Sequence, residues 1–410
     1  MAREHPLIVS LDIGTYKTAV VVARAAPDEV EILAVGMAPS GQGLRKSQVI
    51  NIDVTVQAVR KAVEEAQIGA ACDIHTVCAS ISGEHIFGGV SGGAWAVKNR
   101  EVDSADVQRV LEIARAVVLP PGYEILHVLP QEFWVDGHER GRDPLGASGV
   151  RLESSVQIIA APGDAIQTIH KCGERAGLEV QGVHFAALAA AESVVTPEEK
   201  ELGVAVVDVG GGSTGLVAYS RGVVQYAAVL PVGGGHITND LAAGLRTTMT
   251  EAEKLKQKYG CAVPSLVTNG DLVEMPKVGV RDPLPLQRRR LSEIIEPRVE
   301  EIFSLVREQF YQAGVLNKLE SGIILTGGSV IMEGMTEIAE RIFRLPVRRG
   351  APRHLTGLID AANSPMYATG VGLVLCELQQ VRLKGASRPS ETRGWRRARE
   401  RVAEWIREFF

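Results

Sequence analysis

Two stretches of the chain share one pattern and decide the fold: residues 7–22 read LIVSLDIGTYKTAVVV, and residues 203–218 read GVAVVDVGGGSTGLVA. Each stretch has an apolar strand, an aspartate, a glycine-containing turn with threonine and a second apolar strand, which together indicate a β-hairpin. The two aspartates, Asp12 and Asp208, are 196 positions apart. The repeat predicts two similar α/β domains that face one cleft.

The residue types in these hairpins are suited to phosphate. A glycine-rich turn lets backbone N–H groups point at phosphate oxygens, and threonine hydroxyls add further donors. An aspartate at the end of a strand suits Mg²⁺, which keeps several waters and takes one or two carboxylates. One such hairpin alone is equally compatible with an ordinary turn, but the pair, with both aspartates in register, favours phosphate binding from two sides.

Three further motifs refine this interpretation. Residues 211–215 (GGSTG) match the nucleophile elbow of serine hydrolases, but that elbow needs a following helix and residues 216–219 (LVAY) continue as a strand, so we reject a hydrolase. Residues 323–335 (IILTGGSVIMEGM) predict a strand, a Gly-Gly turn and a helix, and the paired glycines would let a base or ribose approach the main chain. Residues 367–374 (YATGVGLV) predict a small-residue helix that packs closely against another helix.

Composition separates the body of the chain from its end. The 410 residues carry 44 Lys plus Arg against 49 Asp plus Glu, a net charge of -5, which argues against a nucleic-acid-binding protein. Residues 382–410 contain nine basic residues and four glutamates, so this tail is +5 and the body is -10. The five cysteines form no C-x-x-C, the nine histidines lack metal-ligand spacing, and no signal peptide is recognisable, so we expect a reduced, cytosolic protein.

The tail has two parts. Residues 382–394 (RLKGASRPSETRG) predict a flexible linker. Residues 395–410 predict an amphipathic helix of about 24 Å, too short and too charged to span a bilayer. Its apolar face and two of its arginines would bind a membrane surface, although docking on the body or on a partner is the alternative. These residues are Trp395, Val402, Trp405, Ile406, Phe409, Phe410, Arg396 and Arg397.

The two hairpins, the Gly-Gly turn and the small-residue helix, in this order, resemble the pattern of the actin-like ATPase superfamily. The chain resembles more closely the FtsA family of bacterial division proteins, from about Leu7 to Leu375 and again in the tail. The most specific segments are residues 230–240 (LPVGGGHITND), 252–260 (AEKLKQKYG) and 293–301 (EIIEPRVEE).

The resemblance implies an α/β, actin-like ATPase fold, with two similar domains around a nucleotide cleft and the 1C subdomain insertion of that family. An inserted domain without a special role remains the alternative for residues 81–160. The implied subdomains are 1A at 1–80, 161–202 and 351–381, 1C at 81–160, 2A at 203–230 and 318–350, and 2B at 231–317, followed by the linker at 382–394 and the membrane-targeting helix at 395–410.

The resemblance also implies a site for ATP and Mg²⁺. Asp12 and Asp208 would hold Mg²⁺ through waters. Glu253 and Lys256, three apart on one helix face, would reach the ribose or base, or would simply be solvated. The residues expected to contact the nucleotide are Asp12, Gly14, Thr15, Lys17, Asp208, Gly210, Gly211, Gly212, Thr214, Glu253, Lys256, Gly327, Gly328 and Ser329.

One position departs from the superfamily pattern. Actin-like ATPases carry a Gln or Glu that orients the attacking water at the start of the first connecting helix, but here that position falls near His184 or Phe185. Because positioning carries phosphoryl transfer, we predict ATP binding with weak or no hydrolysis, and no residue is assigned as catalytic.

The function that the resemblance implies is that of an ATP-binding division protein that polymerises and tethers FtsZ filaments to the inner face of the cytoplasmic membrane at the division site. Its partners would be the FtsZ C-terminal peptide on 2B, with Arg298 as the main contact, itself, phospholipid, and later division proteins such as FtsN through 1C. The alternatives are a small-molecule kinase of the same superfamily, for which no general-base motif is evident, and a chaperone-type ATPase, for which no β-rich domain follows residue 381.

Overall fold

The computed structural model describes residues 7–25, 30–275, 284–353, 355–358 and 362–386. The first domain contains a six-stranded sheet in the order β11-β6-β1-β2-β3-β19. The predicted hairpin of residues 7–22 forms its centre, where β1 and β2 pair antiparallel with Asp12 opposite Ala19. The strands are β1 (Leu7–Ile13), β2 (Lys17–Ala25), β3 (Val30–Pro39), β6 (Thr76–Ile81), β11 (Glu179–Phe185) and β19 (Leu355–Gly357).

The second domain repeats this plan. Its five-stranded sheet has the order β14-β13-β12-β17-β18, and in its central hairpin Asp208 lies opposite Gly215. Each aspartate is therefore the penultimate residue of the first strand of its hairpin, as the repeat predicts. The strands are β12 (Val204–Val209), β13 (Thr214–Ser220), β14 (Val223–Leu230), β17 (Ile323–Thr326) and β18 (Val347–Arg349).

Two helices with small residues join the domains. The predicted small-residue helix is α11 (Ala368–Ala386), and it packs directly on α4 (Ala186–Val194). A Cβ on Gly372 would overlap the Ala189 carbonyl oxygen, and the Ser193 hydroxyl donates to the Ala368 carbonyl at 2.9 Å. This close packing confirms the prediction. The outer helices of the first domain are α1 (Ile52–Ala70) and α3 (Gly163–Ala176), and α5 (Pro197–Leu202) follows α4.

An insertion with its own core projects from the first domain. Its sheet has the order β7-β10-β8-β9, and α2 (Ser104–Arg115) packs on β7 and β10. The buried residues of this core include Val107, Phe133 and Leu152. The strands are β7 (Phe87–Ala96), β8 (Tyr123–Val135), β9 (His138–Gly141) and β10 (Arg151–Pro162).

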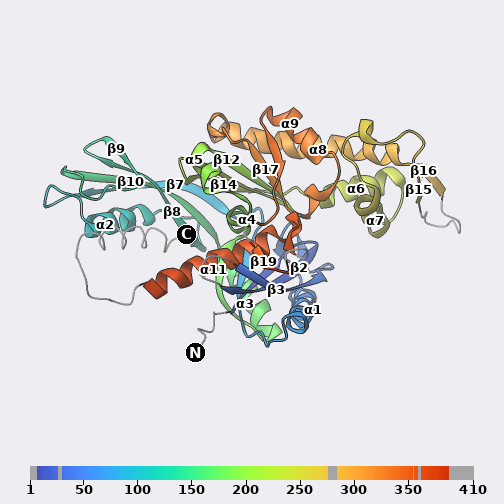
Figure 1. Cartoon of the computed structure of the whole chain (residues 1–410), viewed down its shortest axis with the longest axis horizontal. Coiled ribbons are helices and arrows are strands. Elements are labelled where there is room, and N and C mark those ends of the chain that lie inside the picture. The colour runs from blue at the N-terminus through green and yellow to red at the C-terminus, as the bar shows by residue number, and fades with distance from the viewer. Residues whose placement is uncertain (1–6, 26–29, 276–283, 354, 359–361, 387–410) are drawn as a thin grey trace.

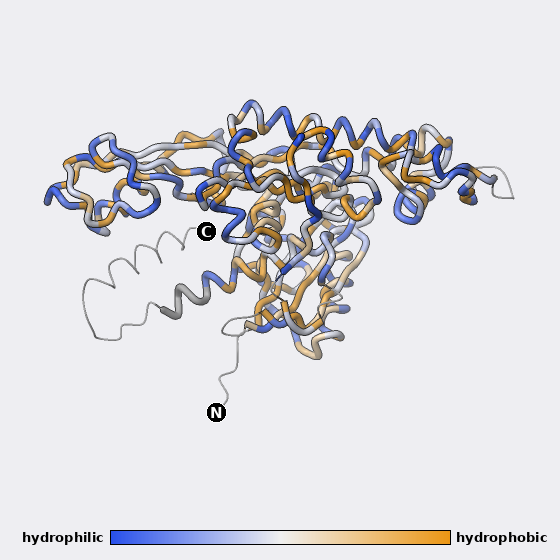
Figure 2. Tube along the Cα trace, turned by 45° about the horizontal axis from the view of Figure 1, so that its top comes forward, coloured by the Kyte–Doolittle hydropathy of each residue, from blue (hydrophilic) through white to orange (hydrophobic). Residues whose placement is uncertain are grey.

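A helical extension projects from the second domain at the opposite end of the molecule (Figure 1). Its core is continuous with that of the second sheet, because Leu241 and Ile295 belong to the same buried cluster as Val207 and Leu325. Apolar segments accordingly run through the central strands (Figure 2). The elements are α6 (Gly234–Leu245), α7 (Met249–Tyr259), β15 (Leu272–Met275), β16 (Leu284–Gln287) and α8 (Arg288–Gln312), and α9 (Met335–Phe343) follows β17.

Several short elements connect the longer ones. The strands β4 (Leu44–Arg45) and β5 (Gln48–Val49) form a tight hairpin between β3 and α1. Single 3₁₀ turns lie at η1 (Pro264–Leu266), η2 (Leu316–Lys318), η3 (Gly328–Ile331) and η4 (Pro365–Tyr367). Among the residues described, no helix combines the length and apolar character needed to cross a bilayer.

The predicted start of the linker is wrong. We expected a linker from residue 382, but α11 continues to Ala386. Leu383 and Lys384 favour helix, and the strong breaker Pro389 comes only later in the sequence. The remainder of the predicted linker, residues 387–394, and the predicted membrane-targeting helix at 395–410 lie outside the described residues.

Candidate functional site

The turns of the two central hairpins are closed in the same way. The Gly14 N–H donates to the Lys17 carbonyl at 3.0 Å, and the Gly210 N–H donates to the Ser213 carbonyl at 3.0 Å. Both turns follow directly on the strand that carries the aspartate. The two aspartates therefore lie at equivalent places, one in each domain.

The aspartates face each other closely enough to interact. Asp12 accepts a hydrogen bond from the Ser80 hydroxyl at 2.8 Å. Burial, and then the charge of Asp12, raise the pKa of Asp208 from 3.8 to about 7, while Lys17 and a hydrogen bond from Thr369 act in the opposite direction. Two carboxylates held this way would be stabilised by a divalent cation.

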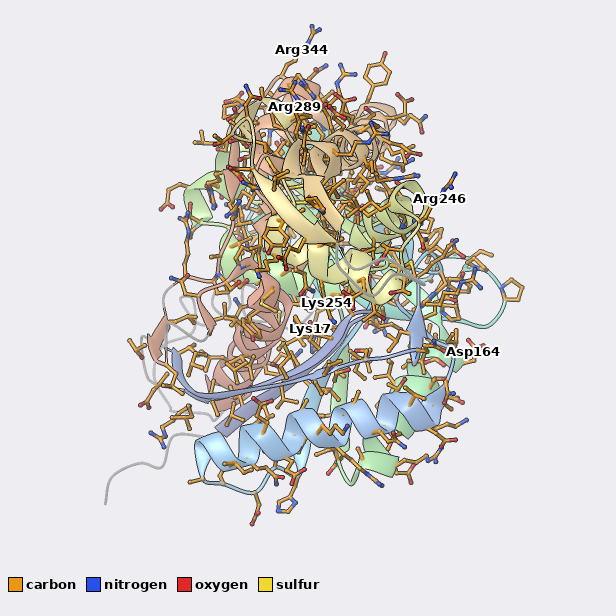
Figure 3. The ribbon with its side chains drawn as sticks, turned by 90° about the vertical axis from the view of Figure 1, so that its right-hand side faces the viewer. Lys17, Asp164, Arg246, Lys254, Arg289 and Arg344 are labelled. Carbon is orange, nitrogen blue, oxygen red and sulfur yellow. The ribbon has the colours of Figure 1, made fainter. Side chains whose placement is uncertain are left out.

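Lys17 supplies a positive charge beside this pair. Its Nζ lies 3.5 Å from Asp12 Oδ2 and 5.1 Å from the centre of the Tyr367 ring, and it is buried with no hydrogen-bond partner in the described part of the chain. Figure 3 labels Lys17 between the first sheet and the domain above it. An ammonium group has three donors to satisfy, so Lys17 is suited to the oxygens of a bound anion.

The tips of the two turns lie against each other. A Cβ on Gly212 would overlap the Thr15 hydroxyl and lie 3.0 Å from the backbone of Lys46 and Ser47. A Cβ on Gly211 would lie 3.1 Å from the Tyr16 Cβ. The absence of side chains at 211 and 212 is thus what lets the second hairpin approach the first.

The Gly-Gly turn after β17 forms a third side. Gly327 has a φ of 90°, and a Cβ there would overlap Asp208 Oδ1. The Ser329 hydroxyl donates to the Gly210 carbonyl at 3.0 Å, and Gly234 at the start of α6 lies directly against Ser329. The predicted adenosine turn and the second phosphate hairpin therefore meet.

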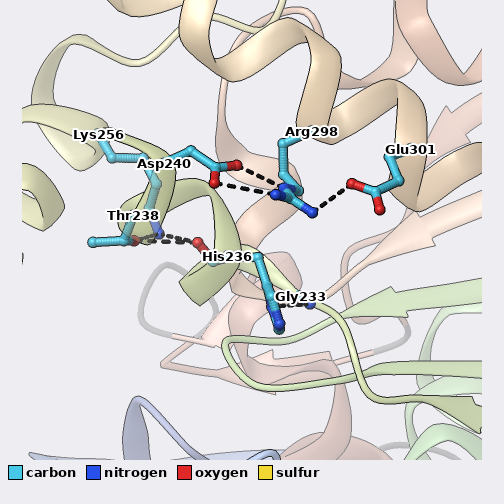
Figure 4. Close-up of polar contacts among 8 residues, drawn as sticks. Gly233, His236, Thr238, Asp240, Lys256, Arg298 and Glu301 are labelled. Carbon is cyan, nitrogen blue, oxygen red and sulfur yellow. Dashed lines mark hydrogen bonds and ion pairs between the residues drawn. The ribbon is translucent and has the colours of Figure 1, made fainter. Parts of the chain in front are cut away.

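Glu253 and Lys256 reach this place from α7. Their side chains form an ion pair at 2.8 Å and are largely buried, so the solvated alternative is excluded. Lys256 Nζ also donates to the Gly234 carbonyl at 2.9 Å and to the Thr238 hydroxyl at 2.8 Å (Figure 4). The Lys256 ammonium thus contacts the first residue of α6, Gly234, which borders the Ser329 turn.

Most of the predicted residues come together around these three turns, and Thr214 is the exception. Its side chain is fully buried, and its hydroxyl donates to the Val232 carbonyl at 2.7 Å. The neighbouring Ser213 hydroxyl instead lies 2.7 Å from the Ser47 hydroxyl. Strand alternation explains the difference, because Thr214 begins β13 with its side chain towards the core. Sequence reasoning also missed Tyr16, Ser47, Ser80 and Gly234.

The residues at the start of α4 are engaged elsewhere. His184 Nε2 lies 3.4 Å from Glu377 Oε1, and the Phe185 ring is fully buried in the core. The Phe185 N–H donates to His127 Nε2 at 3.0 Å, and burial together with His184 lowers the pKa of His127 to about 3. Neither of the two side chains at the expected position is therefore available to orient a water.

Arg298 lies on α8 and has carboxylate partners within the chain. Its guanidinium donates to both oxygens of Asp240 on α6, at 2.6 and 3.1 Å, and also contacts Glu301 (Figure 4). The Asp240 hydrogen bond raises the pKa of Arg298. A carboxylate from a partner would have to share the Arg298 guanidinium with Asp240 or displace Asp240 from it. Sequence reasoning missed Asp240.

The residues of the three turns fit a Mg²⁺–nucleotide. Lys17 Nζ has no hydrogen-bond partner among the described residues. Burial and the nearby charge of Asp12 raise the pKa of Asp208, and the main chain is open at Gly328, where the nearest atom to an added Cβ is 3.8 Å away. When bound, Mg²⁺ would neutralise phosphate charge between the two carboxylates.

Comparisons with known proteins identify the family of this chain. A family model described as "Cell division protein FtsA" matches residues 205–372, and one described as "SHS2 domain inserted in FTSA" matches residues 83–160, the insertion that carries α2. The cell division protein FtsA of Pseudomonas aeruginosa is 44% identical over 375 residues, which are 91% of this chain and 90% of the relative.

Solved structures show that the fold is the actin-like ATPase fold. The PilM–PilN type IV pilus biogenesis complex matches with a TM-score of 0.64 at 16% identity, over 90% of this chain and 98% of that one. MreB5 of Spiroplasma citri bound to ADP matches with a TM-score of 0.56 at 12% identity, over 94% and 99%. The fold class, the insertion and the identity to a full-length relative together lead to one conclusion: this chain belongs to the FtsA family of cell division proteins.

Proposed function

We propose that this division protein binds ATP with Mg²⁺, polymerises, and tethers FtsZ filaments to the inner face of the cytoplasmic membrane at the division site, where it recruits later division proteins. The observation that carries the nucleotide part is the convergence of the two hairpin turns, the Asp12–Asp208 pair and the buried Lys17 ammonium, which has no hydrogen-bond partner among the described residues. Family membership supports the division role.

The nucleotide would be held from three sides. Lys17 and the turns at 14–15 and 210–212 would bind phosphate oxygens, and the two aspartates would hold Mg²⁺ through waters. The turn at 327–329 would lie against the adenosine, next to the Glu253–Lys256 ion pair, whose lysine contacts Gly234. In this proposal the Ser213 hydroxyl takes the place of the Thr214 hydroxyl, which donates to the Val232 carbonyl.

Hydrolysis would be slow. The side chains of His184 and Phe185 contact Glu377 and the core, so neither orients a water for attack. We expect a turnover below about 1 s⁻¹, the low end for enzymes that transfer phosphoryl groups. A faster steady release of phosphate from the purified protein would contradict this part of the proposal.

The FtsZ contact would use the α6–α8 surface. Arg298 is a quarter exposed and already holds a carboxylate bidentately, which is the geometry that an acidic peptide would use. Arg298→Glu should therefore weaken binding of the FtsZ C-terminal peptide. Unchanged peptide affinity in this variant would remove Arg298 from the contact.

The membrane attachment would reside in residues 395–410, outside the described residues. One basic amphipathic segment binds reversibly, whereas several segments on one polymer bind far more tightly through effective concentration. Polymerisation and membrane attachment are therefore linked in this proposal. FtsN and other later proteins would be recruited through the insertion at residues 83–160.

A cosedimentation assay tests the proposal most directly. FtsZ filaments and liposomes with anionic lipid are mixed with the full chain, or with a chain that ends at residue 394. The full chain should carry FtsZ into the liposome fraction, and the truncated chain should bind FtsZ while leaving it in solution. Equal recovery of FtsZ in the liposome fraction with both chains would exclude residues 395–410 as the membrane tether. If neither chain binds FtsZ, FtsZ is excluded as the partner.

A further inference from the structure

Four hydroxyl groups form a chain between the two domains. Ser47 Oγ lies 2.7 Å from Ser213 Oγ and 3.3 Å from Thr15 Oγ1, and Ser213 Oγ lies 3.5 Å from Ser82 Oγ. The Ser47 N–H also donates to Thr15 Oγ1 at 2.8 Å. Ser47 is thus in contact with the first phosphate hairpin through Thr15 and with the second through Ser213.

The backbone at Ser47 is one that serine rarely adopts. Ser47 has a φ of 63° and Lys46 a φ of 49°, and the two residues form the turn between β4 and β5. Turns with two consecutive positive φ values favour Asn and Gly, because a Cβ is unfavourable there. Serine stands at 47 at a conformational cost that glycine would avoid, and strain of this kind is concentrated at functional sites.

The strained turn lies directly on the second phosphate hairpin. A Cβ on Gly212 would be 3.0 Å from Lys46 Cα and from the Ser47 nitrogen. The opposite end of the same hairpin turn contacts the turn at 327–329, because the Gly210 carbonyl accepts a hydrogen bond from the Ser329 hydroxyl. A nucleotide whose adenosine lies at 327–329 would therefore have its last phosphate nearest to Ser47.

The chemistry of this cluster suits a terminal phosphate. A hydroxyl can both donate and accept, so Ser47, Ser213 and Thr15 are able to exchange their mutual hydrogen bonds for bonds to phosphate oxygens. Hydrogen bonds to a charged acceptor are about twice as strong as those between neutral groups. The exchange of hydrogen bonds therefore favours an anion whose terminal phosphate reaches the cluster. A shorter anion that does not reach the hydroxyl groups gains no such bonds.

We propose that Ser47 is a specificity residue of the nucleotide site, whose hydroxyl donates to the terminal phosphate of a nucleoside triphosphate and makes no contact with a diphosphate. This inference rests on the proposed nucleotide binding and concerns its preference between the two ligands. The competing explanation is a purely structural clasp, in which Ser47 only holds the two hairpins together.

The variant Ser47→Gly separates these explanations, because glycine removes the hydroxyl and relieves the left-handed strain. Affinities for the non-hydrolysable analogue AMPPNP and for ADP are measured by isothermal titration calorimetry with Mg²⁺. We expect AMPPNP to bind about tenfold more weakly, as for a lost bond to a charged group, and ADP affinity to stay within about twofold. Arg100→Gly is the matched control, since Arg100 is exposed in the insertion with a φ of 56°.

Two further measurements keep the test decisive. Ser47→Ala removes the hydroxyl without freeing the backbone, so it should reduce the AMPPNP preference equally, even if the glycine variant folds poorly. In the parent protein, hydrogen exchange of the segment 44–49 should be slower with AMPPNP than with ADP, and the difference should vanish in Ser47→Ala.

Each outcome has one meaning. Equal losses of affinity for AMPPNP and ADP would show a structural clasp and overturn the inference, as would an unchanged preference in both Ser47 variants. If the parent protein binds neither nucleotide, the proposed function fails and the inference falls with it. If the parent protein binds both nucleotides and the Ser47 variants keep its preference for AMPPNP over ADP, the proposed function stands and only the role of Ser47 is refuted.

Discussion

Replacing Asp208 by asparagine should change how the stability of the metal-free protein depends on pH. Asparagine has nearly the shape of the protonated aspartate but carries no titratable charge. In the parent protein, burial and Asp12 raise the pKa of Asp208 to about 7. A group whose pKa is higher in the folded state than in the unfolded state stabilises fully below the unfolded pKa, and this contribution is lost as pH rises through the folded pKa.

The size of the effect follows from the two pKa values. One pKa unit corresponds to about 1.4 kcal/mol, so the difference between 3.8 and about 7 corresponds to a loss of up to about 4 kcal/mol in the free energy of unfolding. The loss accumulates between about pH 4 and pH 7. The Asp208→Asn protein should lack this decline and should be more stable than the parent at pH 8 without Mg²⁺.

The assay is guanidinium unfolding, followed by circular dichroism, at half-unit steps from pH 5 to pH 8 in EDTA. Asp73→Asn is the control, because Asp73 is exposed in a loop after α1 and its replacement should leave the parent slope unchanged. Adding Mg²⁺ and ADP at pH 8 should stabilise the parent much more than Asp208→Asn. The same pH slope for parent and Asp208→Asn would refute the reasoning.

Three other predictions concern separate parts of the molecule. Gly372→Ala should lower the free energy of unfolding by about 3 kcal/mol, because the new Cβ would overlap an α4 carbonyl oxygen. Thermal unfolding measures the loss, with Gly182→Ala as the control, since the nearest atom to a Cβ there is 3.4 Å away. Equal losses in both variants would count against the close packing of α11 on α4. Lys17→Met should weaken ADP binding at least about tenfold in calorimetry, because an anion loses its buried ammonium partner; unaltered affinity would place the phosphates elsewhere. Asp240→Asn should strengthen FtsZ peptide binding, because it removes the bidentate partner of Arg298 and leaves the contact with Glu301. A weakened complex would show that Asp240 positions Arg298 instead.

Much of the fold was predictable because its decisive elements are local in sequence. In each central hairpin the strand, aspartate and glycine turn are contiguous. The aspartate is the penultimate residue of the first strand in both, as the repeat predicts. The small residues of α11 likewise indicated close packing, which Gly372 against Ala189 bears out. The hydrophobic and glycine patterns carry this information directly.

The missing parts of the site depend on contacts that no local pattern encodes. Arg298 and Asp240 are 58 positions apart, and only the packing of α6 on α8 brings them together. The Lys46–Ser47 turn lacks the Asn-Gly signal that its positive φ values would normally demand. Ser213 and Thr214 are adjacent hydroxyl residues, and the sequence did not indicate which of them faces the core.

The length of α11 has a mechanical consequence. Its first turn is tied to the site, because Thr369 donates a hydrogen bond to Asp208, and the helix continues without a break to Ala386. Nineteen residues make a rod of about 28 Å, so a tilt of about 10° at Thr369 would displace the far end by about 5 Å. If a change at Asp208 shifts Thr369 and tilts α11 in this way, the displacement would be larger at Ala386, from which the chain leads into the basic tail, than at the site itself.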